Sequence, residues 1–238
     1  MKSQYKCIDS FSGAGGLCLG LIEAGFDVLY SFDIDSKSIA TINANSKYFK
    51  GHKAEVRDIY DISPLKLLQD INLKSGELDL LAGGPPCQGF SIQRIGSDID
   101  ERNHLVEEYI SQVIAINPKM FMLENVPGIE GKRGLTILQK ALEIVAESGY
   151  FIHKQILDAQ DYGVPQRRRR VVIVGERKDH TVPIFKYPTP CKHRVTVREV
   201  IGHLPIPPED GSEHPTLSLH RRDRLSAKNI ERLQHLQP

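Results

Sequence analysis

The sequence predicts an α/β fold with a doubly wound, mostly parallel sheet and an irregular C-terminal extension. Short apolar runs typical of buried strands alternate with segments whose apolar residues recur at helical spacing. Strands that alternate with helices in this way favour parallel neighbours and helices on both faces of the sheet. Eight of the fourteen prolines lie beyond Gly175, which indicates that the regular alternation ends there.

The elements can be assigned in chain order. Strands are predicted at residues 6–11, 28–32, 78–82, 120–123, 151–157 and 171–174. Helices are predicted around residues 17–24, 36–45, 104–116 and 135–145. Ser36 is the expected cap of the second helix, Pro118 ends the third, and Gly149 closes the fourth.

The composition predicts that the chain beyond the last strand forms a separate region. We expect residues 1–180 to form the main domain and residues 181–238 to form a proline-rich extension. The extension ends in one helix, with Ser226 as its cap and Leu225 placed to contact Ile230. Ile230, Leu233 and Leu236 would form the apolar stripe of that helix.

Composition excludes several classes of protein. The formal net charge is +1, so any affinity for nucleic acid must come from local basic patches. No apolar run approaches the length of a membrane span, and the N-terminus lacks a signal-peptide pattern. The four cysteines show no C-x-x-C pair, which argues against a zinc site. We therefore expect a reduced, cytoplasmic protein without a bound metal or a membrane partner.

The glycine-rich turn after the first strand resembles a nucleotide-cofactor site. Glycines in residues 11–16 let the backbone approach a ligand, and the following helix N-terminus favours negative charge. Asp33 or Asp35 ends the next strand about 20 residues further on, where a ribose ligand is expected. Asp58 is a third candidate ligand. The spacing suits S-adenosylmethionine or a nicotinamide, but the glycines depart from G-x-G-x-x-G. An ordinary strand–helix turn remains the alternative.

The stretch from Gly83 to Ser91, GGPPCQGFS, is the most informative in the chain. Two prolines stiffen the backbone before Cys87, and the flanking glycines allow close approach of another molecule. The preceding strand places Cys87 at a carboxyl end, where open α/β sheets bind ligands. The alternative is a tight turn around a small buried cysteine.

Two further polar groups lie next to strand-like runs. Glu124 comes after the strand ending at Leu123, where a carboxylate suits proton donation or charge stabilisation. Four consecutive arginines, residues 167–170, precede the last strand. In extended backbone Arg168 and Arg170 share one face, which could grip a phosphate or a carbonyl. A strand-end cap for Glu124 and a charged edge strand for the arginines are the alternatives.

Taken together and in order, these segments resemble the DNA (cytosine-5)-methyltransferase family. The matching blocks are residues 9–16, 83–91, 124–126 and 166–170, within a region from Tyr5 to about Gly175. The resemblance implies a Rossmann-like, S-adenosylmethionine-dependent fold and methyl transfer to C5 of cytosine in double-stranded DNA. It also implies covalent attack by Cys87 on a flipped base, assisted by Glu124, Arg168 and Arg170.

The same matching assigns binding residues. Phe11 would stack near the adenine, Asp33 would take the ribose hydroxyls, and Asp58 would bind the adenine amino group. The remaining cofactor residues would be Ser12, Gly13, Gly15, Gly16 and Pro85. Gln88 and Ser91 would contact DNA, and residues 92–103 resemble the family's closing loop.

The chain departs from the family where target recognition should begin. The variable recognition domain and the closing Gly-Asn motif are not found. We expect either a fragment or the larger subunit of a split enzyme, with a second polypeptide supplying the rest in a prokaryotic restriction–modification system. The apolar surface that this part would cover should then be exposed. The alternatives are a tRNA cytosine-5 methyltransferase of the same fold, a non-catalytic subunit, or a nicotinamide oxidoreductase.

Overall fold

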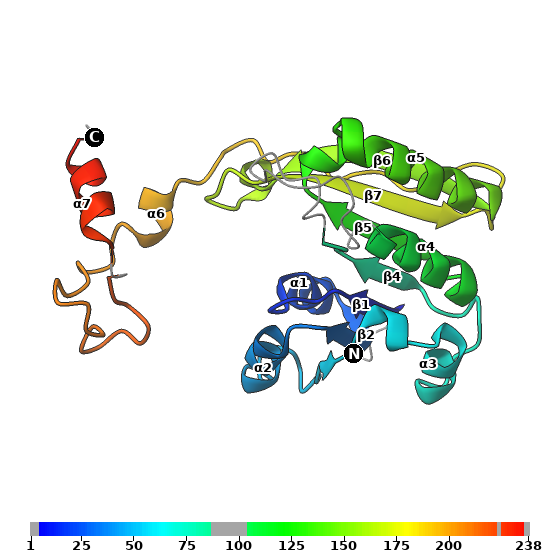
Figure 1. Cartoon of the computed structure of the whole chain (residues 1–238), viewed down its shortest axis with the longest axis horizontal. Helices are drawn as coiled ribbons and strands as arrows, with labels where there is room; N and C mark the ends of the chain where they lie inside the picture. Colours follow the sequence, from blue (N-terminus) through cyan, green and yellow to red (C-terminus); the bar gives the residue numbers. More distant parts are fainter. Residues whose placement is uncertain (1–4, 87–103, 223–224, 236–238) are drawn as a thin grey trace.

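A seven-stranded sheet forms the body of the molecule (Figure 1). The computed structural model describes residues 5–86, 104–222 and 225–235. The strand order is β3-β2-β1-β4-β5-β7-β6. The strands are β1 (Tyr5–Ser10), β2 (Phe26–Asp33), β3 (Glu55–Val56), β4 (Leu80–Gly83), β5 (Met120–Asn125), β6 (Tyr150–Asp158) and β7 (Arg169–Arg177).

Helices connect the strands and flank the sheet. The α-helices of the body are α1 (Gly16–Glu23), α2 (Ser36–Ala44), α3 (Pro64–Asp70), α4 (His104–Ile116) and α5 (Lys132–Glu147). Short 3₁₀ helices are η1 (Ile59–Asp61), η4 (Pro127–Glu130) and η5 (Ala159–Tyr162). The extension carries α6 (Val197–Ile201) and α7 (Ala227–Gln234).

The two faces of the sheet have separate cores because alternate strand residues point to opposite sides. Ile8 and Leu81 pack with apolar residues of α3, α4 and α5. Their neighbours Cys7 and Leu80 pack on the other face with residues of α1 and α2. The prediction of helices on both faces is therefore confirmed.

The predicted parallel sheet is confirmed with one reversed strand. β1 to β5 pair in parallel, whereas β7 runs antiparallel to both β5 and β6. β5 extends through Asn125, so Glu124 lies inside the strand and not after it. β7 begins at Arg169, so half of the arginine run is already strand. Both strands are longer than predicted because their pairing continues past the apolar residues that mark them: Glu124 and Asn125 of β5 pair with β7, and Arg169 and Arg170 of β7 pair with β6.

Two details of the helix predictions were wrong or incomplete. The cap of α2 is Asp35, whose carboxylate accepts the backbone N–H groups of Lys37 and Ser38; Ser36 is already the first helical residue. An aspartate placed one residue earlier reaches the same donors with a full negative charge. α3 was missed, although Pro64 after Ser63 is a typical helix start.

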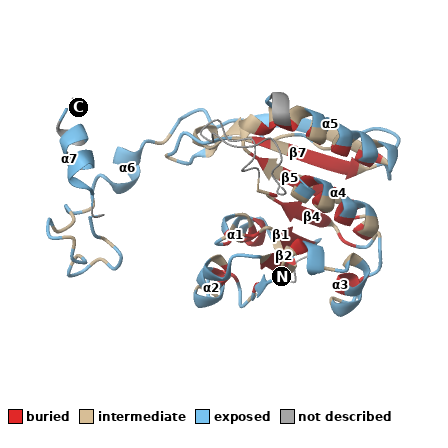
Figure 2. Ribbon diagram, viewed as in Figure 1, coloured by how far each residue is buried: buried red, intermediate tan, exposed pale blue. Residues whose placement is uncertain are grey.

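Hydrogen bonds link the first part of the extension to the body. The Glu176 carboxylate accepts the N–H groups of Ile184 and Phe185, and the Tyr187 hydroxyl donates to the Val172 carbonyl. Further on, α6 and α7 project away from the sheet (Figure 1) and are largely exposed (Figure 2). The Asn229 N–H lies 3.4 Å from Ser226 Oγ, as expected for a cap of α7. The stripe side chains Ile230, Leu233 and Leu236 lie outside the described residues.

Candidate active site

The predicted site segments meet at one edge of the sheet. Ser10 pairs with Gly83, and Gly83 pairs with Leu123, so β1, β4 and β5 end side by side. The glycine-rich turn, the segment from Gly84 to Pro86 and the carboxylate of Glu124 therefore lie at the same edge. This is the position at which ligands bind in open α/β sheets.

The glycine-rich turn has a constrained backbone. Phe11 adopts φ 56°, a left-handed conformation that is costly for an aromatic residue and is concentrated at functional sites. Gly15 has φ 92°, and a Cβ there would lie 2.6 Å from the Phe49 ring. Asp33 fixes the turn from the neighbouring strand, because its Oδ2 accepts the Gly13 N–H at 2.8 Å. The turn is thus held in one shape.

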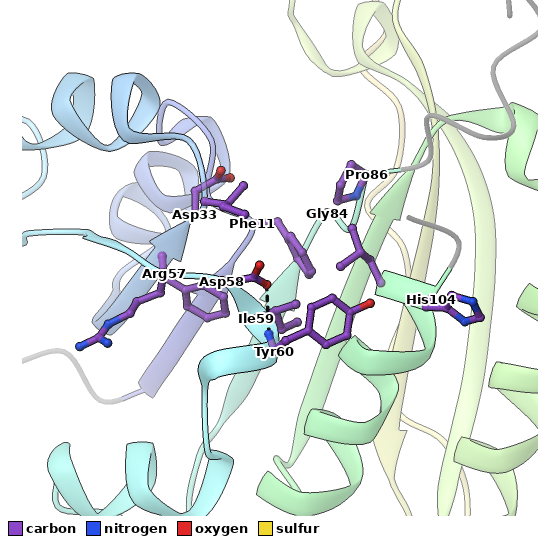
Figure 3. Close-up of a pocket in the computed structure, with 12 residues that line it drawn as sticks. Phe11, Asp33, Arg57, Asp58, Ile59, Tyr60, Gly84, Pro86 and His104 are labelled. Carbon is purple, nitrogen blue, oxygen red and sulfur yellow. Dashed lines mark hydrogen bonds between the residues drawn. The ribbon is translucent and has the colours of Figure 1, made fainter. Parts of the chain in front are cut away.

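A cavity of about 930 Å³ opens beside this turn (Figure 3). Three predicted cofactor residues, Phe11, Asp33 and Asp58, line it. Asp58 Oδ1 accepts the Tyr60 N–H at 3.1 Å, which orients the carboxylate. The other residues that line this cavity are Phe32, Ile34, Arg57, Ile59, Tyr60, Gly84, Pro86, His104 and Leu105. Sequence reasoning missed Ile34 and Tyr60, although both follow the acids it had singled out by only one or two residues.

A second cavity of about 660 Å³ adjoins the first, since Phe11 and Gly84 line both. It contains Ser12 and two predicted catalytic residues, Glu124 and Arg168. Its apolar walls are Leu17, Met122, Leu157, Val172, Val174, Phe185, Tyr187 and Pro188. A carboxylate and a guanidinium group therefore lie next to the candidate cofactor cavity.

Glu124 and Arg170 form an ion pair across β5 and β7, with Arg170 Nε 2.6 Å from Glu124 Oε1. Both side chains are partly exposed, and Glu124 lines the second cavity. A Cβ at Gly84 would lie 3.3 Å from Glu124 Oε2. Glycine therefore lets the Pro-Pro segment pass close to the carboxylate. Arg168 is exposed, and its backbone N–H is held by Asp158 Oδ1 at 3.0 Å.

Asn125 is a site residue that sequence reasoning did not assign. It is almost fully buried, and its Nδ2 donates to the Pro85 carbonyl at 2.9 Å. Its Oδ1 accepts the Val126 N–H at 2.9 Å. The amide thereby links β5 to the backbone two residues before Cys87. A buried amide with one donor and one acceptor committed to main chain is a positioning device.

Three predicted site residues, Cys87, Gln88 and Ser91, lie outside the described residues. Of the predicted glycines, Gly13 and Gly15 have positive φ and Gly16 opens α1. Pro85 enters the site through its carbonyl, which receives the Asn125 bond. Within the described ranges no cluster of His, Cys, Asp or Glu suits a metal ion. No helix in the same ranges has the length and apolar character of a membrane span.

Comparison with known protein families identifies the family of this chain. The family model for C-5 cytosine-specific DNA methylase matches residues 5–237. The chain belongs to that family. The resemblance carried by the four motif blocks is thus confirmed over almost the whole chain.

Several proteins named as Type II methyltransferases are similar in sequence. The Type II methyltransferase M.XorII of Xanthomonas oryzae pv. oryzae is 35% identical over 223 residues, which cover 93% of this chain and 50% of that protein. M1.HphI of Haemophilus parahaemolyticus is 38% identical over 201 residues, covering 83% and 52%. The chain thus spans about half the length of these relatives. M.AquIA of Picosynechococcus sp. differs, since the chain covers 77% of it at 36% identity.

Solved structures give the same fold. A prophage-encoded protein of E. coli, named as a DNA modification methyltransferase, aligns with TM-score 0.73 and 33% identity over 85% of this chain and 56% of its own. A Spodoptera frugiperda DNMT2 variant aligns with TM-score 0.59 at 22% identity, over 77% of this chain and 53% of its own, which shows likeness of fold alone.

Proposed function

We propose that this chain carries the cofactor and catalytic part of an enzyme that methylates C5 of cytosine in DNA. The observation that carries the proposal is the Glu124–Arg170 ion pair, whose carboxylate lines the second cavity and lies close to Gly84, just before the two prolines. Membership of the methylase family and the named Type II methyltransferase relatives support it. The relatives also support a role in a restriction–modification system.

S-adenosylmethionine fits the first cavity by the chemistry of its lining. An adenosyl group needs an aromatic contact and acceptors for its hydroxyl and amino hydrogens, and Phe11, Asp33 and Asp58 offer these. Ser12 Oγ is buried without a hydrogen-bond partner among the described residues, which leaves it for a ligand. Gly13, Gly15, Gly16 and Pro85 would shape the turn and the floor. Bound S-adenosylmethionine supplies an electrophilic methyl group on a positively charged sulfur.

The chain's own residues would make cytosine reactive. Cytosine C5 is a poor nucleophile, so we propose that the Cys87 thiolate adds to C6 of a base flipped out of the duplex. C5 then takes the methyl group. Loss of the C5 proton to solvent breaks the Cys87–C6 bond and restores the ring.

Three residues would support this addition. Glu124 would contact ring N3 and stabilise the protonated ring, while Arg168 would hold the carbonyl oxygen. Arg170 would keep Glu124 in place through their 2.6 Å contact. Gln88 and Ser91 would contact the DNA that surrounds the flipped base.

A second polypeptide or segment would complete the enzyme. We propose that residues 1–180 carry the chemistry and that residues 181–238 lead toward a target-recognition part. The second cavity has an apolar wall made by β7 and Tyr187. Large apolar side chains of the extension are also exposed, among them Val182, Ile184, Ile206 and Leu219. Exposed apolar surface of this kind marks an interface.

Covalent capture of 5-fluorocytosine tests the function. Fluorine at C5 cannot leave as a proton does, so the cysteine adduct persists. We expect duplex DNA with 5-fluorocytosine to be trapped in the presence of S-adenosylmethionine, with tRNA transcripts carrying the same base left free. The trap is read as a mass shift of the full chain, with and without a polypeptide encoded beside it. Capture of tRNA alone would establish the RNA alternative, and capture of neither would oppose the proposal.

Glu124→Gln should slow capture by about 10²–10⁴-fold, the usual contribution of a positioned acid. The amide keeps the shape of the side chain but neither protonates N3 nor pairs with Arg170. Glu130→Gln is the matched control, because Glu130 also pairs with a cation, Lys154 at 2.7 Å, away from both cavities. An unaffected Glu124→Gln rate would remove Glu124 from the chemistry.

Asn125→Asp should lower the capture rate by about 10²-fold while cofactor affinity stays within about twofold, since small displacements of a reacting group are costly. The aspartate replaces a donor with an acceptor facing the Pro85 carbonyl. Asn43→Asp breaks a comparable amide pair with the backbone of Ala54 on the far side of β2. Equal losses in the two variants would show that Asn125 contributes only stability.

A further inference from the structure

One buried carboxylate in the body is left unexplained by the proposed chemistry. Asp9 is completely buried near the carboxyl end of β1, two residues before Phe11. Neither of its carboxylate oxygens has a hydrogen-bond partner within the described part of the chain. Buried carboxylates are normally paired with a cation or hydrogen-bonded to several donors. A buried carboxylate without such partners is therefore unusual and needs a physical explanation.

Among the described residues, no positive charge is recorded as acting on Asp9. The groups that face it from the packed elements are Asp33 of β2, Cys7 of its own strand, Cys18 of α1 and Tyr109 of α4. All four are acids or neutral groups. The Cys18 N–H in the first turn of α1 faces the carboxylate outside hydrogen-bond geometry and offsets only part of the cost. Burial, followed by the nearby Asp33, raises the pKa of Asp9 to about 8.

Asp9 is nevertheless next to the candidate cofactor site. Asp33, whose charge acts on Asp9, lines the first cavity and accepts the Gly13 N–H, and Phe11, two residues after Asp9, lines the same cavity. Ser12, which also has an unpartnered buried oxygen, lines the second cavity. A positive charge brought to the glycine-rich turn would therefore act on Asp9 through a medium of low dielectric, where charges interact strongly.

We propose that Asp9 holds a proton in the ligand-free protein and releases it to solvent when a cationic sulfonium ligand binds at the glycine-rich turn. The inference rests on the proposed function, which supplies the sulfonium. It adds a role in selection: S-adenosylmethionine carries the charge on sulfur, whereas its product, S-adenosylhomocysteine, does not. Ionised Asp9 favours the first, whereas the second lacks the charge, leaves Asp9 protonated and gains no affinity from it. By linkage, the same free energy appears as a pH dependence of binding.

The direction of this dependence follows from where the proton goes. Because binding releases the proton, the preference for S-adenosylmethionine over S-adenosylhomocysteine should grow with pH by up to about tenfold per unit below about pH 8. Above that pH both states are ionised and the preference should level off. In the absence of ligand the folded state binds this proton more tightly than the unfolded chain. Stability should therefore fall as pH rises from about 4 to about 8.

Calorimetry of the full chain in buffers with different ionisation enthalpies measures the proton directly. At about pH 7 we expect S-adenosylmethionine to release about one proton more than S-adenosylhomocysteine does. Asp9→Asn should abolish this difference and flatten the stability loss with pH. Asp79→Asn is the matched control, because Asp79 is also a sheet carboxylate but is bonded to Lys119 at 2.7 Å. It should leave the difference unchanged.

A measurement on the unmodified protein covers the case in which Asp9→Asn does not fold. With isotopically labelled aspartate, the infrared band of a protonated carboxyl group should disappear when S-adenosylmethionine is added and persist with S-adenosylhomocysteine. Binding of both ligands with equal proton release and no band change would overturn the inference and leave the proposed function intact. Failure to bind either ligand would count against both.

Discussion

Replacing Cys87 with serine is expected to abolish methyl transfer and covalent capture of 5-fluorocytosine. A serine hydroxyl is far less ionised near neutral pH and is a much weaker nucleophile than a thiolate, so addition to C6 should fail. Cofactor binding should remain in this variant. Phe11, Asp33 and Asp58 line a cavity that does not depend on the sulfur, so affinity for S-adenosylmethionine should stay within about twofold.

Cys191→Ser is the control for this substitution. Cys191 is exposed in the extension, and its backbone N–H donates to the Asp161 carbonyl. Its replacement should leave transfer and capture unchanged. Transfer that survives Cys87→Ser would end the assignment of Cys87 as nucleophile, whereas loss of cofactor binding in the same variant would mean that the loop shapes the first cavity.

Gly175→Ala is expected to produce the largest loss of stability among single-methyl additions to the sheet. A Cβ at Gly175 would lie 1.8 Å from Phe121 Cε1, and the Phe121 ring is fully buried. The ring cannot move away, because it packs edge-on against Tyr150 with centroids 5.5 Å apart. We expect a loss of about 3 kcal/mol, the upper range for overpacking, seen as a lower midpoint in urea unfolding.

Gly20→Ala provides the matched comparison. Gly20 is exposed in α1, and a Cβ there meets no atom within 4 Å. Because alanine is the better helix former, this variant should be neutral or more stable by up to about 1 kcal/mol. Adding Phe121→Leu to Gly175→Ala should recover part of the loss, since the two residues share one space. A Gly175→Ala protein as stable as the parent would contradict the packing described between β5 and β7.

The sequence was sufficient to predict those elements whose pattern depends on local residue types alone. Alternating apolar runs predicted six of the seven strands, because a buried strand needs a continuous apolar stretch; β3, two exposed residues long, has none. The resemblance implied that Glu124 and Arg170 belong to one catalytic arrangement, and the two side chains are in contact. What could not be predicted depends on pairing between distant segments. The reversal of β7 is one such feature, because no single run encodes the direction of its partner.

The missed site residues have the same origin. Asn125 reads as part of a motif, but its bond to Pro85 joins segments 40 residues apart. Asp9 reads as one polar residue in a strand, and only its burial beside Asp33 gives it significance. Asp35 was weighed as a cofactor ligand, although the structure uses its side chain to cap α2. In each case the chemistry lies in a tertiary contact that spacing alone does not reveal.

The central claim is tested most directly by locating a labelled methyl group. Full-length chain, alone and with a polypeptide encoded beside it, would be incubated with labelled S-adenosylmethionine and cytosine-containing duplex DNA, and the nucleosides analysed by mass spectrometry. We predict label on C5 of cytosine, with activity that depends on the second polypeptide. Label on another base or on RNA only, or no label under either condition, would contradict the account.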